Sequence, residues 1–420
     1  MKKTLWTKNF TTITLGTIVS SIGSTALNLV LSFVVFSNTE STFLFSIFSA
    51  ISLIPNLLLP LLLSAYIDRI PRKPIIVFLD FLNGCTMFLF GYFILKYSFN
   101  FNMFLTFSLI ESCISSVYSI SYQSLYPKLI PEGMSQKGYT VSSMIYPTVT
   151  IIASPLGSLL YTKVGIGPIV IAYGFLLWIA SFFEHFIDIH EETTIHSFDF
   201  KQYLNDMKST LQYFKEEKGI RYTYMAMPFS QGFSEGTEPL IMAYFSSTPT
   251  LGITLYSFFT VSQFIGRTLG GIVNYKIEYP KEKRFSICYF VYIFYSIMDG
   301  ILLLLPYPFM LLDRALSGFC GINSATLRES SVQNYIPDDK RAKLNAFMNI
   351  FYTLASIICK LIFGALGEFI QIKTLMIAGS ICLIGIYHFI LYNNREYIKP
   401  IYNQNYWFAS KKQLMIVVYH

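Results

Sequence analysis

Apolar residues occur along the chain in blocks, and short polar segments separate these blocks. A helix of about 20 apolar residues spans the hydrocarbon core of a bilayer, so each block of that length predicts one membrane-spanning helix. Twelve such blocks can be placed, and together they predict an all-α integral membrane protein. The predicted spans are 10–36, 42–67, 74–96, 102–124, 138–161, 167–188, 222–246, 251–275, 284–305, 307–330, 344–367 and 372–392.

One long polar segment interrupts the series of apolar blocks. Residues 189–221 are rich in Lys and Glu, and they predict a short amphipathic helix on the membrane surface. This segment divides the chain into an N-terminal bundle of six spans (1–188), a central cytoplasmic loop (189–221), a C-terminal bundle of six spans (222–392) and a cytoplasmic tail (393–420).

The composition excludes an ordinary water-soluble globule. Hydrophobic residues make up 53% of the 420 residues and charged residues only 13%, whereas about a quarter of a soluble domain is charged. The net charge of +7 does not indicate a nucleic-acid partner, because the basic residues lie in short segments between spans, where membrane topology explains them. We expect a monomer whose partner is the lipid bilayer.

The distribution of Lys and Arg predicts the orientation in the membrane. If the N-terminus is cytoplasmic, the cytoplasmic segments carry 25 Lys and Arg and the outer segments carry 3. Cytoplasmic segments are enriched in Lys and Arg, so this bias favours the orientation chosen. We expect a multi-pass protein of the plasma membrane, in a bacterium the inner membrane, with both termini in the cytoplasm.

The two predicted bundles share landmarks at a constant spacing. Ile130–Glu132, after the fourth span, recurs as Ile336–Asp338 after the tenth, 206 residues later. The same offset places Asn274 at the position that corresponds to Asp68. Landmarks at equivalent places in the topology indicate duplicated halves, and transporters built from such halves bind substrate at the interface between them.

A dense charge cluster, Ser64–Lys73, lies in the short gap between the second and third spans. Asp68 falls at the C-terminal end of a helix, where the helix dipole disfavours a carboxylate, so it needs positive partners. The stretch resembles the signature loop of the major facilitator superfamily, Gly-x-x-x-Asp-Arg-x-Gly-Arg-Lys. Ser64 and Pro71 stand where the pattern has glycines. The charged positions all match, and they are Asp68, Arg69, Arg72 and Lys73.

The resemblance extends over nearly the whole chain. The stretches Tyr126–Pro131 and Leu251–Ile253 make it look most like the macrolide-efflux-type exporters, a branch of the proton-coupled drug antiporters. This resemblance implies twelve transmembrane helices in two pseudo-symmetric bundles, the major facilitator fold. It also implies a proton gradient as the energy source without a cofactor, and a gating role for the charged loop, whose second copy holds Asn274.

Two acidic residues in the seventh span are candidates for binding protons and substrate. Glu235 and Glu238 are three residues apart, so they share one face of a helix. Two carboxylates this close and away from bulk water should not both stay ionised, which suits proton coupling. The neighbours Gly232, Gly236 and Pro239 should loosen the helix, as in the discontinuous helices of transporter binding sites.

Other charged residues inside predicted spans mark either a pathway or an ion pair, because a charge in the bilayer is costly. Glu111, in the other half, either completes a polar cavity with Glu235 and Glu238 or is a protonated side chain bonded to Ser108 or Ser112. The remaining candidates for intramembrane ion pairs are Asp299, Asp313, Arg314 and Lys360. A purely structural pairing of Glu235 and Glu238 with Arg314 or Lys360 is the alternative to proton coupling.

The sequence favours a transporter over an enzyme. A Walker loop, a Ser/His/Asp order and zinc-type ligand spacing are all missing, so ATP hydrolysis, other hydrolase chemistry and a metal site find no support. We expect proton-coupled export of a small lipophilic drug or natural product by alternating access, as in multidrug or macrolide resistance. A uniporter or importer of a small solute, or a membrane sensor without transport, remains the alternative.

Overall fold

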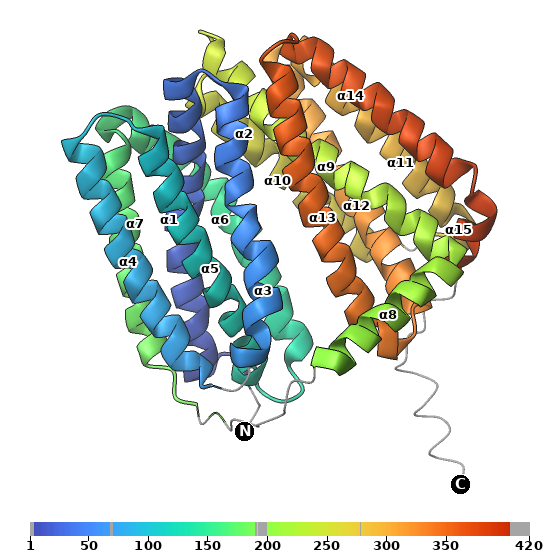
Figure 1. Cartoon of the computed structure of the whole chain (residues 1–420), viewed down its shortest axis with the longest axis horizontal. Helices are drawn as coiled ribbons and strands as arrows, with labels where there is room; N and C mark the ends of the chain where they lie inside the picture. The colour runs from blue at the N-terminus through green and yellow to red at the C-terminus, as the bar shows by residue number, and fades with distance from the viewer. Residues whose placement is uncertain (1–3, 68–69, 190, 192–199, 278, 404–420) are drawn as a thin grey trace.

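The computed structural model describes residues 4–67, 70–189, 191, 200–277 and 279–403, and helices make up most of this length. Figure 1 shows two groups of helices side by side, with α1 to α7 on the left and α9 to α15 on the right. The helices of the first group are α1 Lys8–Thr39, α2 Thr42–Ile51, α3 Leu53–Ile67, α4 Arg72–Lys96, α5 Phe101–Leu129, α6 Ser135–Val164 and α7 Ile166–His185.

The second half begins with a helix that lies across the lower end of the molecule in Figure 1. The helices from that point on are α8 Phe200–Glu216, α9 Lys218–Ser247, α10 Ile253–Lys276, α11 Lys281–Ile301, α12 Tyr307–Tyr335, α13 Asp338–Gly367, α14 Ile372–Tyr387 and α15 Arg395–Tyr402. Two short helical turns, η1 Leu302–Leu304 and η2 His388–Tyr392, extend α11 and α14.

The helices confirm the predicted all-α, twelve-span architecture. Each predicted span coincides with one helix, except that the second span is divided into α2 and α3. Within the described residues, nine helices are long and apolar enough to cross a membrane by length and composition. The three further spans, α9, α10 and α12, have 30, 24 and 29 residues. They are long enough to cross, and all three carry embedded charges that lower their hydropathy.

Consecutive spans are joined by short connections, and particular residues make the tight turns possible. Only Gly165 lies between α6 and α7. Its backbone φ is +76°, a value that residues other than glycine rarely adopt. Asn100 begins α5 by accepting a hydrogen bond from the backbone N–H of Met103. Such tight connections make consecutive spans run antiparallel.

The two halves contact each other mainly through two pairs of helices. In one pair α2 packs against α13, and in the other α6 packs against α10. The first pair joins spans two and eleven, and the second joins spans five and eight. A shift of six spans turns span two into span eight and span eleven into span five, so the two pairs are equivalent by the repeat. The interface therefore has the pseudo-two-fold symmetry that duplicated halves predict.

Contacts between the halves gather at the predicted outer side. Thr42 Oγ1 donates to the carbonyl of Gly364 at 2.7 Å, and the hydroxyls of Ser158 and Ser257 lie 3.2 Å apart. A Cβ atom added to Gly364 would lie 2.9 Å from the backbone carbonyl oxygen of Thr42, so a glycine is needed for α2 and α13 to approach this closely. The outer ends of the two halves are thus packed together in this conformation, as Figure 1 shows for α2 and α13.

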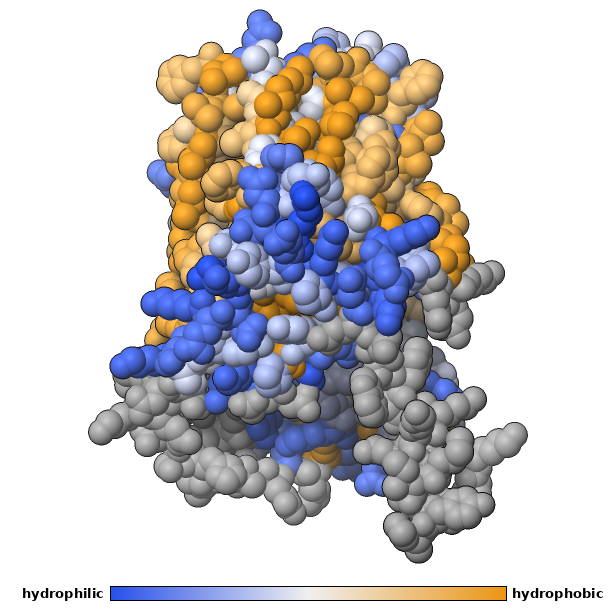
Figure 2. All heavy atoms as spheres, turned by 90° about the vertical axis from the view of Figure 1, so that its right-hand side faces the viewer, coloured by the Kyte–Doolittle hydropathy of each residue, from blue (hydrophilic) through white to orange (hydrophobic). Residues whose placement is uncertain are grey.

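The surface that faces lipid is apolar. In Figure 2 hydrophobic residues cover the upper part of one face of the molecule, and hydrophilic residues gather in its lower part. Large apolar side chains stand exposed on the second half, among them Phe290 and Phe389 at 68% and 73%. A continuous apolar belt of this kind is what a bilayer, rather than water, accommodates.

The segments outside the predicted spans contain two helices. The central loop holds α8, which packs on α9 and α13, as the predicted amphipathic helix would. The region predicted as a tail holds α15, and Ile398 and Ile401 of this helix are almost fully buried against the C-terminal bundle. Residues up to 403 therefore belong to the packed structure of the second half.

Candidate functional site

The seventh span, α9, is one continuous helix, which corrects the expectation of a loosened segment around Gly232 and Gly236. These glycines face α13. A Cβ atom at Gly236 would lie 3.0 Å from the carbonyl carbon of Cys359, and one at Gly232 would lie 3.0 Å from the carbonyl oxygen of Ala355. Glycine at both positions lets two helix backbones approach closely, as is common between membrane helices. The small residues bring α13 to α9 rather than breaking α9.

This close packing brings Lys360 of α13 to the two acidic residues of α9. Lys360 Nζ lies 3.1 Å from Glu235 Oε2 and 2.6 Å from Glu238 Oε2. The Lys360 side chain is 4% exposed, whereas those of Glu235 and Glu238 are 34% and 47% exposed. One buried cation is therefore shared by two partly exposed carboxylates, and of these Glu238 lines the cavity described below.

The helix break lies instead in the second span. The α-helical pattern stops at Ile51 and resumes at Leu53, just before Pro55, which has no N–H for the preceding turn. The carbonyl of Ser52 accepts hydrogen bonds from Asn56 Nδ2 at 3.1 Å and from the Ser112 hydroxyl. Side chains thus satisfy a backbone group that the break has freed, which is how irregular backbone is tolerated at membrane depth beside a cavity.

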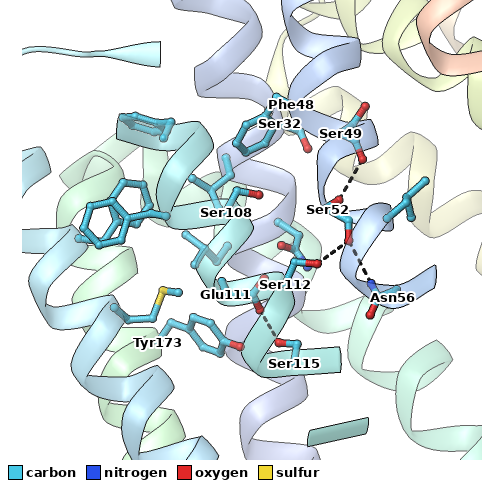
Figure 3. Close-up of a pocket in the computed structure, with 18 of the residues that line it drawn as sticks. Ser32, Phe48, Ser49, Ser52, Asn56, Ser108, Glu111, Ser112, Ser115 and Tyr173 are labelled. Carbon is cyan, nitrogen blue, oxygen red and sulfur yellow. Dashed lines mark hydrogen bonds between the residues drawn. The ribbon is translucent and has the colours of Figure 1, made fainter. Parts of the chain in front are cut away.

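A cavity of about 320 Å³ lies between this break and the Lys360 group. Most of its wall comes from α1 to α5, and Glu238 and Lys360 close it from the second half. Figure 3 shows Ser49, Ser52 and Asn56 on one side, Tyr173 beside Ser115 on the other, and Phe48 near Ser32. A volume of this size is in the range of small-molecule sites, which occupy about 300–1,000 Å³.

Glu111 lies in the wall of this cavity. Its Oε1 accepts a hydrogen bond from Ser115 at 2.8 Å, one helical turn further along α5. Ser112, a partner weighed from the sequence, bonds the carbonyl of Ser52 instead. The structure thus brings Glu111, Glu238 and Lys360 to the same cavity, although they are widely separated in the sequence.

The other intramembrane charges form a separate site within the second half. Arg314 of α12 lies 3.0 Å from Asp299 of α11, and both side chains are almost fully buried. The guanidinium also stands over the ring of Phe259, 5.0 Å from its centroid. Asp313 is buried next to Arg314 in the chain. Arg314 is therefore committed to Asp299, and it is Lys360 that meets Glu235 and Glu238.

The charged loop between the second and third spans is described only in part. Asp68 and Arg69 lie outside the described residues. Glu191 of the central loop accepts bonds of 2.9 Å from the backbone N–H groups of both Arg72 and Lys73, at the start of α4. A carboxylate at a helix N-terminus is electrostatically favoured. The counterpart residue Asn274 lies near the end of α10, and its gating role stays a prediction.

Sequence reasoning missed two buried acids in the first half. Asp80 of α4 and Glu184 of α7 are 5% and 0% exposed, and Tyr118 donates a hydrogen bond to Glu184 Oε1 at 2.5 Å. Both acids lie inside apolar blocks, which was the available signal. Among the described residues, no group of three or more His, Cys, Asp or Glu is arranged to hold a metal ion.

Sequence reasoning also missed Glu368, which joins the halves at the predicted outer side. Its Oε1 accepts hydrogen bonds from Ser41 Oγ at 2.8 Å, Thr42 Oγ1 at 3.0 Å and the Phe43 N–H at 2.8 Å. It therefore caps the N-terminus of α2 from the far half. Burial alone would raise the pKa of Glu368, but these hydrogen bonds lower it below its ordinary value of 4.5.

Glu368→Gln should loosen the packed outer side. The amide keeps one accepting oxygen but loses the charge, and because Glu368 is solvent-exposed the loss should be about 0.5–1 kcal/mol. A cysteine placed at the buried Ser46 should then react roughly two- to fivefold faster with an impermeant reagent added outside.

The pH dependence of the same labelling follows from the lowered pKa of Glu368. The cap contributes fully above the ordinary carboxyl pKa and is lost as the outside pH falls through the lowered value. Labelling at Ser46 should therefore change little between pH 8 and 6 and rise only in acid. An equal rate in the Glu368→Gln and parent proteins would contradict a closing role for this contact.

The comparisons with known proteins agree with this architecture. A family model described as Major Facilitator Superfamily matches residues 13–298 and 220–405. A comparison with curated protein sequences gives no match. The crystal structure of the nucleoside transporter NupG superposes with a TM-score of 0.69 at 13% identity, covering 91% of this chain and 98% of the other.

A second solved structure is similar over an equal length. It is a bacterial homolog of the human lysosomal transporter Spinster, in an inward-facing and unoccupied conformation. It superposes with a TM-score of 0.62 at 11% identity, covering 95% of this chain and 98% of that one. At these identities the likeness concerns the fold.

Proposed function

The chain belongs to the major facilitator superfamily, and on this basis we propose that it is a proton-coupled secondary active transporter that exports a small drug or natural product. The observation that carries the proposal is the shared cation at the cavity: Lys360 contacts both Glu235 and Glu238. One cation cannot neutralise two carboxylates, so the group can bind a proton without losing its ion pair. Macrolide-efflux specificity stays a prediction from the sequence resemblance.

In the proposed mechanism, proton binding and substrate binding compete at the cavity between the halves. The cavity has walls from both halves, so its occupant contacts them together. A proton or substrate that binds one conformation better shifts the equilibrium between inward-open and outward-open forms. Glu368 holds the outer ends together, and the Asp68–Lys73 loop holds the inner ends in the opposite conformation. Alternation between these two contacts moves the cargo.

Import or uniport of a small solute is the second candidate. The similar crystal structures include a nucleoside transporter, and the cavity wall contains hydroxyl and amide side chains, which suit a polar solute. The direction of transport is set by how the proton gradient is coupled, so one experiment on coupling separates the export, import and uniport alternatives.

Glu235→Gln should uncouple transport from the proton gradient. Glu238, the closer partner at 2.6 Å, keeps Lys360 paired, so the protein should fold while the spare carboxylate is lost. In proteoliposomes, gradient-driven movement of ethidium and of uridine should fall to the level seen without a gradient, and exchange without a gradient should persist.

Glu132→Gln, at an exposed loop position, is the matched control and should behave as the parent protein. Accumulation by Glu235→Gln at the parent level, with the parent pH dependence, would remove Glu235 from the coupling mechanism and leave Glu111 as the candidate. Gradient-independent flux in the parent protein itself would establish the uniporter.

A further inference from the structure

The cavity has two chemically different walls. Phe48, Phe90 and Phe104 are buried aromatic residues that line it, and the rings of Phe90 and Phe107 stack at 4.5 Å between centroids. Serine and asparagine side chains from α1, the α2–α3 break and α5 form the other, polar wall, as Figure 3 shows for Ser49, Ser52, Asn56 and Ser108. A ligand that fills both walls must have a flat apolar part and a separate polar part.

Several polar groups of this wall are available to a ligand. Among the described residues, Ser32 and Ser108 make no hydrogen bond to protein, so each hydroxyl can donate and accept. Ser49 and Ser52 donate to backbone carbonyls of their own helix at 3.3 and 2.9 Å, which leaves their oxygens able to accept from a ligand. The polar wall therefore offers both hydrogen-bond donors and acceptors. A ligand with adjacent hydroxyl groups suits it, because each hydroxyl can also donate and accept.

The charges around the cavity exclude an anionic ligand. The cation that lines it, Lys360, already has two carboxylate partners, and Glu111 adds a third acidic group from the opposite half. Bringing a phosphate or carboxylate into this space would place like charges together away from bulk water. A neutral ligand meets hydroxyls and rings without that cost.

We propose that this cavity binds an uncharged solute in which a hydroxyl-bearing ring is joined to a flat apolar group, with the hydroxyls on the serine wall and the flat group against the phenylalanines. Nucleosides and aryl glycosides share this chemistry. The inference rests on the proposed transport function and names the class of its cargo. A site built to hydrogen-bond hydroxyls rejects an analogue that lacks them far more strongly than an apolar pocket discriminates by size.

The test is counterflow exchange in proteoliposomes at equal pH on both sides, which requires binding and translocation but no proton coupling. The probes are uridine, 4-nitrophenyl glucoside, uridine monophosphate and ethidium. Uridine, the glucoside or both should exchange, with the phosphate at least tenfold slower than uridine. The relative rates of uridine and the glucoside distinguish the two sources of the shared chemistry.

Ser108→Ala should raise the KM for the exchanging probe about two- to tenfold, because one hydrogen bond is lost. Phe107→Leu should raise it similarly by removing a ring. Ser143→Ala, whose hydroxyl bonds its own helix at an exposed position, is the control and should leave the KM unchanged. If Ser108→Ala folds poorly, Ser32→Ala provides the same test on α1.

Exchange of ethidium alone, or a Ser108→Ala KM equal to the parent value for every probe, would overturn the proposal. The proposed function fails separately. If uridine exchanges but a pH gradient does not drive its accumulation, the cargo class stands and proton coupling is wrong. If a gradient drives ethidium while neither hydroxylated probe exchanges, coupling stands and the cargo class is wrong.

Discussion

Lys360→Met should lower gradient-driven transport at least about tenfold, because it removes the buried cation that both carboxylates contact. Methionine fills nearly the same space, so the change removes mainly the charge. Glu235 and Glu238 then face each other without the cation that both contact at 3.1 and 2.6 Å. Their mutual repulsion is then no longer offset by a shared cation, so the group would lose the arrangement on which the proposed coupling rests.

The design separates coupling from folding. Lys163→Met, at an exposed position near the end of α6, is the matched control and should transport as the parent does. The triple variant Glu235→Gln, Glu238→Gln, Lys360→Met removes all three charges together, so it should recover stability and gradient-independent exchange but not coupling. Gradient-driven accumulation by Lys360→Met at more than a third of the parent rate would show that the shared cation is not part of the coupling device.

The architecture could be predicted from the sequence because a membrane span is recognisable from its length and its apolar composition. Each block of apolar residues became a helix, and the offset of 206 residues predicted the symmetry that relates the α2–α13 and α6–α10 contacts. The position of the helix break could not be predicted in the same way. Glycine loosens a helix in isolation, but Gly236 is held against Cys359, and that contact depends on tertiary packing.

The candidate site was predictable only as far as one helix face. The spacing of Glu235 and Glu238 places them together, but the choice between Arg314 and Lys360 as partner depends on which helix packs beside α9. Nothing in the sequence of the other spans indicates whether the helix with Arg314 or the helix with Lys360 packs beside α9. Glu368 escaped notice because it follows a span, where acidic residues are common, and its partners precede it by more than 300 residues.

The cargo chemistry was harder still to predict from the sequence. A single serine in a membrane helix usually bonds its own backbone, so Ser108 or Ser32 alone indicates nothing. Only the folded chain shows that serines from α1, α2 and α5 line one cavity together with aromatic rings. The prediction of a lipophilic cargo followed from the resemblance to drug exporters, and the aromatic rings make up only part of the cavity lining.

Arg314→Met should destabilise the protein by about 3–5 kcal/mol, the usual cost of leaving a buried charge without its partner. The guanidinium lies 3.0 Å from Asp299, and the two side chains are 7% and 3% exposed. Its removal would leave Asp299 and the buried Asp313 as carboxylates without a nearby cation. Thermal unfolding of the purified protein in detergent, with the Lys163→Met variant as reference, measures the loss.

The double variant Asp299→Asn, Arg314→Met should recover more than half of that stability, because it removes both charges and keeps the shape of the aspartate side chain. A buried ion pair is often worth little against neutral residues of equal volume, while half of a pair is costly. Since this pair lies apart from the transport cavity, the double variant should also retain gradient-driven transport. A double variant as unstable as Arg314→Met would mean that the arginine acts through its contact with the Phe259 ring, 5.0 Å away, rather than through Asp299.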